Sequence, residues 1–152
     1  MIYLSQMLGK PVVDANDDEI GTISDIAIAT REVFPRVTSL AFLGPDKTPF
    51  MLSWRKYVAE LDDDRIALNV PAHEIRFSYL QPDEVLLSRD LLDKQIVDTQ
   101  GMKVVRVNDL KLSESKSQLR LLGAEVGIRG ILRGLHPVVE HAVAGLARLV
   151  GR

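Results

Sequence analysis

The sequence predicts a mainly β protein built from two copies of one strand–turn–strand unit, with short helical segments and an amphipathic helix at the C-terminus. Short apolar runs alternate with turn-forming residues along most of the 152 residues, as in small barrels and sandwiches. Residues 4–28 and 87–112 also resemble each other, which indicates an internal repeat. After an offset of one residue near Lys10 and Lys94, the matched pairs are Val13 with Val97, Asp14 with Asp98, Ile20 with Val104, Ile23 with Val107, and Asp25 with Asp109.

Each copy predicts the same local order. A leucine-containing lead comes first, then a short strand, a polar turn and a longer second strand that completes a hairpin. The short strands are expected at Pro11–Val13 and Gln95–Val97, the turns at Asp14–Glu19 and Asp98–Gly101, and the second strands at 20–28 and 104–112.

The second strand of each copy contains a phase slip. Side chains of a strand alternate between its two faces, yet the apolar positions change parity at Ser24–Asp25 and again at Asn108–Asp109. An inserted residue would return the apolar set to the core face, so a β-bulge is predicted at both places. The short polar side chains there can satisfy backbone groups that the bulge leaves unpaired.

The remaining elements follow from turn residues and periodicity. Further strands are expected at 37–43, 48–53, 65–70 and 119–126, with a helical turn within 54–60. Apolar residues spaced along one helical face predict a final helix at Val138–Val150, after Pro137. We therefore divide the chain into a first repeat at 1–83, a second repeat at 84–135 and a C-terminal helix at 136–152. The second repeat looks incomplete, so the two are expected to share strands or pack together.

Composition narrows the function classes. With 46% hydrophobic and 26% charged residues, the chain can bury a core and remain soluble. The absence of cysteine excludes disulfides and thiolate metal sites. A polar N-terminus and the lack of a long apolar run favour a cytoplasmic protein. Residues 1–86 carry 8 basic and 14 acidic residues and residues 87–152 carry 11 and 7, so the halves differ in charge.

Three segments carry a family resemblance. LGKPVVDANDDEIGTISDI, LLDKQIVDTQGMKVVRVNDLKL and VGIRGILRGL resemble the PRC-barrel family. The last two are similar to the tandem PRC-barrel region that precedes MgtE-type intracellular and CBS domains in magnesium-transporter-like bacterial proteins. The resemblance implies two small, strongly bent β-barrel repeats. It also implies action by docking onto other proteins, as in a ribosome maturation factor and the photosynthetic reaction centre H subunit. It brings no catalytic residues.

Candidate sites are few. Asp14, Asn16 and Asp18 imitate the first ligands of a calcium loop, but Glu19 stands where that loop needs glycine. The pattern therefore favours an ordinary turn, with a weak Mg²⁺ or Ca²⁺ site as the alternative. Arg129 and Arg133 make the tail basic and could contact a partner. A pI of about 5.9 and 5% aromatic residues argue against nucleic-acid binding.

These observations predict a non-catalytic docking or regulatory module, not an enzyme. Its expected partners are other protein domains or further domains of the same polypeptide, with no cofactor and no nucleic acid. The resemblance adds an association with magnesium transport and a place at the inner face of the cell membrane, near a transporter. Three alternatives stay open: a ribosome- or RNA-assembly adaptor, a weak divalent-cation sensor, and a homo-oligomer.

Overall fold

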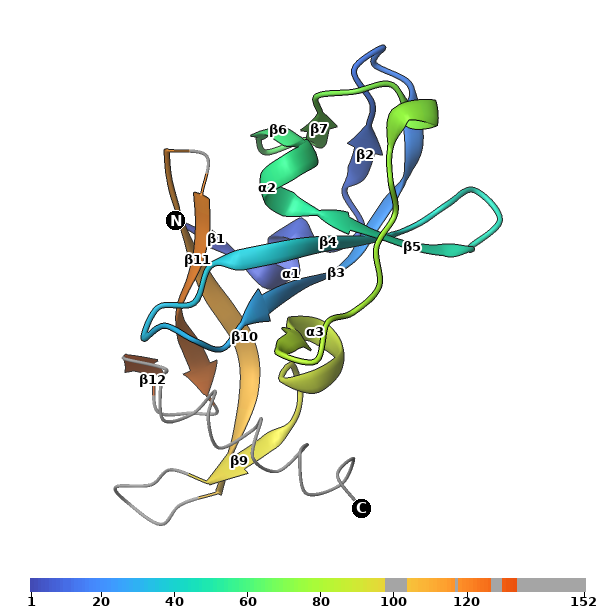
Figure 1. The fold of residues 1–152 in the computed structure, drawn as a ribbon. Coiled ribbons are helices and arrows are strands. Elements are labelled where there is room, and N and C mark those ends of the chain that lie inside the picture. The colour runs from blue at the N-terminus through green and yellow to red at the C-terminus, as the bar shows by residue number, and fades with distance from the viewer. Residues whose placement is uncertain (98–103, 117, 127–129, 134–152) are drawn as a thin grey trace.

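A computed structural model describes residues 1–97, 104–116, 118–126 and 130–133 (Figure 1). The predicted turn at 98–101, Arg129 and the predicted helix at 138–150 lie outside the described residues. Arg133 is the last residue of the strand β12 (Gly130–Arg133). Within these ranges, no helix has the length and apolar character needed to cross a membrane.

The larger of two curled sheets has seven strands. Its order is β5-β4-β3-β2-β7-β6, and β8 pairs with β3 outside this path. Its strands are β2 (Pro11–Val13), β3 (Glu19–Ala29), β4 (Val37–Leu43), β5 (Pro49–Ser53), β6 (Val58–Leu61), β7 (Ile66–Leu68) and β8 (Glu84–Leu86). The β2–β7 pair is parallel, and the other pairs in this sheet are antiparallel.

The smaller sheet has five strands in the order β1-β10-β11-β12, with β9 also pairing with β10. Its strands are β1 (Ile2–Tyr3), β9 (Gln95–Val97), β10 (Val104–Ser115), β11 (Gln118–Val126) and β12 (Gly130–Arg133). The helices are single turns: α1 (Leu4–Met7), α2 (Trp54–Tyr57), α3 (Leu87–Asp90) and the 3₁₀ turn η1 (Ala72–Glu74). This mainly β architecture is the predicted fold class.

The two halves of the chain follow the same order of elements. The first half contains β1, α1, β2, β3, β4 and β5, to which α2, β6, β7 and η1 are added. The second half contains β8, α3, β9, β10, β11 and β12. In the first half β2 pairs with β3, β3 with β4, and β4 with β5. In the second half β9 pairs with β10, β10 with β11, and β11 with β12. The second half therefore has more strands than its sequence predicts.

The turn between helix and short strand is built alike in both halves. Gly9 and Asp93 have positive φ angles of 85° and 62°. Each donates its N–H across to the long strand, to Ile23 O and Val107 O, both at 2.8 Å. The second copy has one residue more than the first. This extra residue lies at the end of α3, about one helical turn before Lys94, near which the sequence predicts the offset. There Leu91 N and Leu92 N both donate to Leu87 O, at 3.1 and 3.0 Å.

The leads of the two halves are exchanged. β1 does not pair with its own long strand β3 but with β10, in the other half. Reciprocally, β8 pairs with β3. Each long strand is thus completed by the strand and helix that precede the other long strand (Figure 1).

A pair of aspartates holds these exchanged leads in place. The Asp25 carboxylate on β3 accepts the N–H groups of Ser88 and Arg89 at the start of α3, at 2.7 and 3.0 Å. The Asp109 carboxylate on β10 accepts the N–H of Ser5 in α1 at 3.1 Å, and also the Ser5 hydroxyl. Burial raises the pKa of the Asp25 carboxyl, and its N–H donors oppose that rise.

Both predicted bulge positions coincide with shifts in register. The β3–β4 pairing shifts between Ile23 and Asp25, so Ser24 is the extra residue. The β10–β11 pairing shifts between Val107 and Asp109, so Asn108 is the extra residue. Each aspartate also accepts the next backbone N–H, from Ile26 and Leu110 respectively, at 2.9 Å. A further shift in each strand was not predicted.

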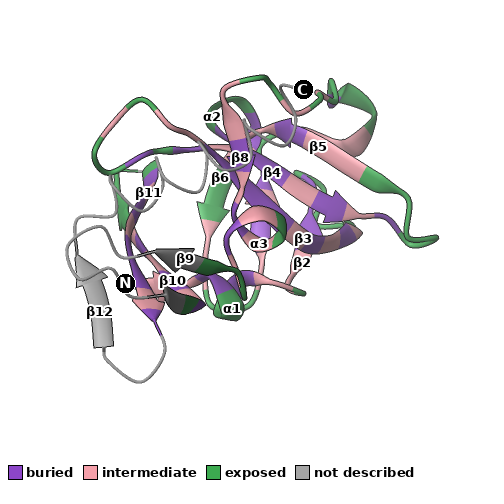
Figure 2. Ribbon diagram, turned by 90° about the horizontal axis from the view of Figure 1, so that it is seen from below, coloured by how far each residue is buried: buried purple, intermediate pink, exposed green. Residues whose placement is uncertain are grey.

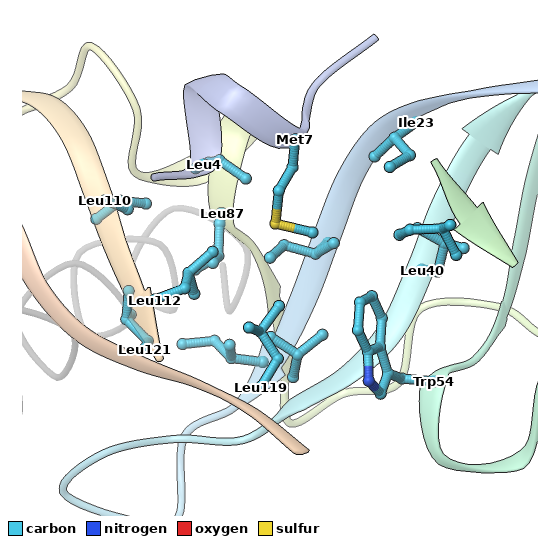
Figure 3. Packing of buried hydrophobic residues seen from close by; sticks show 14 of the residues in the cluster. Leu4, Met7, Ile23, Leu40, Trp54, Leu87, Leu110, Leu112, Leu119 and Leu121 are labelled. Atoms are coloured by element: carbon cyan, nitrogen blue, oxygen red, sulfur yellow. The ribbon is translucent and has the colours of Figure 1, made fainter. Parts of the chain in front are cut away.

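One apolar core lies between the sheets and joins the halves. Figure 2 shows buried residues along the strands and exposed residues in the peripheral loops. Leu4 and Met7 of α1 and Leu87 of α3 are fully buried between the two sheets (Figure 3). Since leads from both halves enter the same core, the two halves share a single hydrophobic centre.

The predicted strand bounds agree with β2, β4 and β9, and lie within three residues for β5, β7 and β11. The helical turn within 54–60 is α2, but residues from Val58 onward form β6. The strands β1, β6, β8 and β12, which have two to four residues each, were not predicted from the sequence.

We expect Asp25→Ala to lower the free energy of unfolding by about 3 kcal/mol. The substitution leaves the backbone N–H groups of Ile26, Ser88 and Arg89 without their acceptor in a buried setting. Urea denaturation followed by circular dichroism measures the change.

Asp63→Ala is the matched control because Asp63 is exposed, and such surface changes stay within about 0.5 kcal/mol. Equal stability losses in both variants would show that the exchanged lead does not depend on the Asp25 carboxylate.

Candidate functional site

A cleft of about 620 Å³ lies where the two halves meet. We call it the interhalf cleft. Its walls come from the β3–β4 loop, from α2 and from the β10–β11 hairpin. The lining residues are Ala29, Arg31, Glu32, Arg36, Val37, Thr38, Ser53, Trp54, Arg55, Val58, Lys116 and Gln118.

The residues of the single-turn helix α2 contribute either to the core or to the cleft. Ser53 caps the turn by accepting Lys56 N–H at 3.3 Å, as serine commonly does at a helix start. Positions three apart share a helix face, so Trp54 and Tyr57 are buried while Arg55 is exposed. The cap thereby directs Arg55 to the cleft.

Arg120 on β11 fixes the opposite wall to the first half. Its guanidinium donates to the Glu32 carboxylate and to Phe34 O, both at 3.0 Å. The neighbouring Leu121 N–H donates to Pro35 O at 2.9 Å. The β3–β4 loop is therefore held against the second half by side-chain and backbone bonds together.

The cleft has an excess of positive charge. Four cationic side chains line it, against the single carboxylate of Glu32. Glu32 already pairs with Arg120 and Arg36, and hydrogen bonds from these two guanidinium groups hold its pKa below the usual value. Arg31 pairs with Asp83. Arg55 and Lys116 form no ion pair with any residue that the structure describes.

Trp54 forms part of the cleft wall and has an unusual environment. Its side chain is 4% exposed, and its ring reaches into the core near Leu40 (Figure 3). The indole N–H has no hydrogen-bond acceptor among the described residues. Buried tryptophan N–H groups usually find a partner, so an unpaired one beside a cleft indicates an incomplete site.

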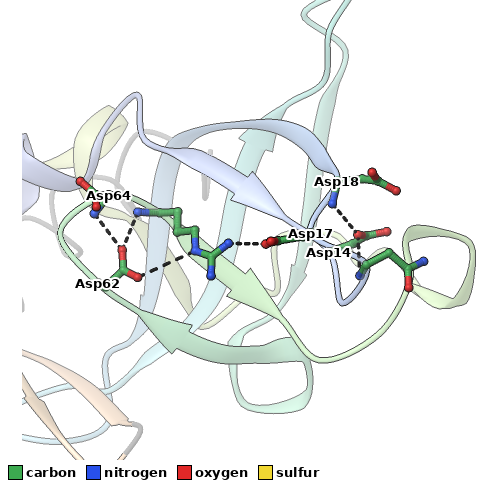
Figure 4. A network of polar contacts seen from close by, with 7 residues as sticks. Asp14, Asp17, Asp18, Asp62 and Asp64 are labelled. Carbon is green, nitrogen blue, oxygen red and sulfur yellow. Dashed lines mark hydrogen bonds and ion pairs between the residues drawn. The ribbon is translucent and has the colours of Figure 1, made fainter.

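Asp14, Asn16 and Asp18, the three predicted metal ligands, lie in one hydrogen-bonded turn. Asp14 is buried, and its Oδ1 accepts the N–H groups of Asn16 and Asp18 at 2.9 and 3.1 Å. Its Oδ2 accepts the N–H of Ala72 at 2.9 Å. Figure 4 shows that Asp18 presents its backbone N–H to Asp14. The loop is a turn closed by three backbone N–H donors to the Asp14 carboxylate.

Neighbouring acidic residues are arranged around one arginine. Arg65 pairs with Asp17 and approaches Asp62 at 3.9 Å (Figure 4). Asp62 also accepts the N–H groups of Asp64 and Arg65, at 2.8 and 2.9 Å. In the described part of the chain, no group of three or more histidine or acidic side chains is placed to hold a metal ion.

The residues of the interhalf cleft were not predicted as a site. They come from three separated segments, so no local motif or spacing marks them. The one usable signal was the single tryptophan after a capping serine, which indicates a helical turn but no site. Of the predicted basic contacts, Arg129 lies outside the described residues, and only the backbone of Arg133 is described.

Fold and site together define a small, mainly β module with a cationic cleft between two similar halves. The PRC-barrel domain family matches residues 1–75, so the first half of the chain is a PRC-barrel domain. No curated protein matches the chain. The matched range includes β1, which pairs with β10, but excludes β8, which completes β3.

The Asp14 turn predicts a pH-dependent stability difference between the native chain and Asp14→Asn. Hydrogen bonds from Ala72, Asp18 and Asn16 lower the pKa of Asp14. The ionised form of Asp14 therefore stabilises the fold at pH values above the ordinary aspartate pKa of about 3.9. This stabilisation is lost as the pH falls through the lower pKa of Asp14 in the folded state. We expect the native chain to melt at a higher temperature at pH 7, with the gap narrowing towards pH 3.

Thermal denaturation across this pH range measures the gap. Asp63→Asn is the control and should melt with the native chain at each pH, since Asp63 is exposed and its side chain accepts no hydrogen bond from any described residue. A gap that widens on acidification would contradict the assignment of Asp14 as an ionised acceptor.

Proposed function

We propose that this chain is a non-catalytic docking module that binds another protein, or another domain of its own polypeptide, at the interhalf cleft. The observation that carries the proposal is the composition of the cleft and its rim. Arginines line the cleft, while Val33 and Phe34 of the β3–β4 loop are 52% and 42% exposed beside them. Exposed apolar residues next to arginine are typical of protein interfaces.

The rigidity of the loop supports this proposal. Arg120 donates to Phe34 O, and Leu121 N–H donates to Pro35 O. The exposed side chains of Val33 and Phe34 are thus presented from a backbone that is already fixed. A preorganised surface loses less conformational entropy on binding than a loose loop.

The finer parts of the proposal rest on sequence. The succession of elements in the second half supports a second PRC-barrel-like repeat. The association with magnesium transport, the cytoplasmic location at the membrane face and the absence of catalysis come from the resemblance and the residue patterns. Of the alternatives, the divalent-cation sensor is the least favoured, because the oxygens of Asp14 accept three backbone N–H groups.

Photocrosslinking in the cells of origin tests the docking surface. A photoreactive phenylalanine analogue replaces Phe34 at the rim of the cleft. The matched control carries it at Phe77, which is 47% exposed and packs on Phe50, with ring centroids 4.8 Å apart. We expect a discrete crosslinked protein or domain from position 34, identified by mass spectrometry.

Position 77 should give no such species. The crosslink from position 34 should also disappear when Arg55 and Lys116 are replaced by glutamine, because both line the cleft. Crosslinks of equal yield from both positions, or none from position 34, would contradict the proposed docking surface.

A further inference from the structure

We infer that the interhalf cleft binds an acidic, extended peptide segment, with carboxylate side chains on Arg55 and Lys116. This inference rests on the proposed docking function and gives the chemistry of its partner. Arg55 and Lys116 both line the cleft and come from different halves, Arg55 from α2 and Lys116 from the β10–β11 turn. Neither has an ion-pair partner among the described residues.

Charge complementarity selects an anionic occupant. The chain has a formal charge of −2, yet its cleft has four cationic side chains and one carboxylate. That carboxylate, on Glu32, is occupied by two arginines. Arg36 bonds to Glu32 through its Nε, and its terminal nitrogens have no hydrogen-bond or ion-pair partner among the described residues, which leaves them for a second carboxylate. Arginine binds carboxylates through paired, parallel N–H donors, which favours aspartate or glutamate side chains.

The buried indole of Trp54 indicates that the occupant also brings a hydrogen-bond acceptor. The unpaired N–H is covered by protein atoms, so a small movement of the wall has to accompany binding. A peptide supplies acceptors at every residue through its backbone carbonyls. Pairing the indole with one of them removes the penalty of the unsatisfied donor.

The shape of the site favours an extended chain. A second groove of about 220 Å³ lies between β6 and the β10–β11 hairpin, and it shares Trp54 and Gln118 with the cleft. β6 is an edge strand of its sheet. The second groove is lined by Glu60 and Glu114, which would repel further carboxylates. The acidic part of the segment therefore belongs in the cleft, and the part beyond Trp54 is neutral or basic.

The test uses the full 152-residue chain and the fluorescence of Trp54, its only tryptophan. Acetylated hexaglutamate is titrated at low salt, and isothermal titration calorimetry gives a second readout. We expect a saturable change in emission with hexaglutamate and none with hexaglutamine. Replacing Arg55 and Lys116 by glutamine should weaken binding by roughly tenfold or more, since two charge-assisted contacts are lost.

Lys47→Gln with Arg76→Gln is the matched control. It changes the net charge by the same amount, at two exposed residues that do not line the cleft. Its affinity for hexaglutamate should stay within about twofold of the native chain, because remote surface charges are screened by salt. Equal weakening in both double variants would overturn the assignment, because it would show that binding depends only on the net charge of the chain.

Other ligands separate the remaining outcomes. Inorganic phosphate that binds as tightly as hexaglutamate would overturn the peptide assignment in favour of a simple anion site. Tighter binding of oligothymidylate would overturn it in favour of nucleic acid. If hexaglutamate fails to bind while Phe34 still crosslinks to a partner, the acidic class is wrong and the docking function stands. Loss of both results removes the docking function as well.

Discussion

The structure depends on two buried or half-buried carboxylates that reach across from one half of the chain to the other. Asp25 and Asp109 each sit beside a bulge in a long strand and accept backbone N–H groups from the helix of the opposite lead. Burying an acidic group is costly unless donors satisfy it, and here the donors belong to the other half. Because each half satisfies the other, neither long strand is complete by itself.

This reciprocal arrangement also explains where the cleft lies. The exchanged leads bring the two long strands around one core, and the loop that follows β3 lies against β11 of the other half. There Arg120 of one half bonds to Glu32 and Phe34 O of the other. The interhalf cleft is therefore a product of the pairing between the halves. A substitution that loosens the exchange should disturb the geometry of the cleft even when it lies far from the cleft.

Features determined by residues close together in the sequence could be predicted. Features determined by pairing between distant strands could not. Proline and glycine bound β4, and a parity change in the apolar pattern locates both register shifts. The apolar pattern does not predict that β1 pairs with β10, because both long strands, β3 and β10, have a similar apolar pattern. The Asp14 loop left two interpretations open for a related reason, since a calcium loop and an Asx turn place aspartate and asparagine at the same spacing.

The exchanged leads show that the range matched by the PRC-barrel family lacks elements that complete its own long strand. Residues 1–75 contain β3 but lack β8 and α3, which pair with β3 and supply donors to Asp25. Produced alone, this range would expose one edge of β3 and leave the Asp25 carboxylate without the N–H groups of Ser88 and Arg89. An open edge of this kind favours pairing with another chain. The second half therefore covers this edge of β3 from within the same chain.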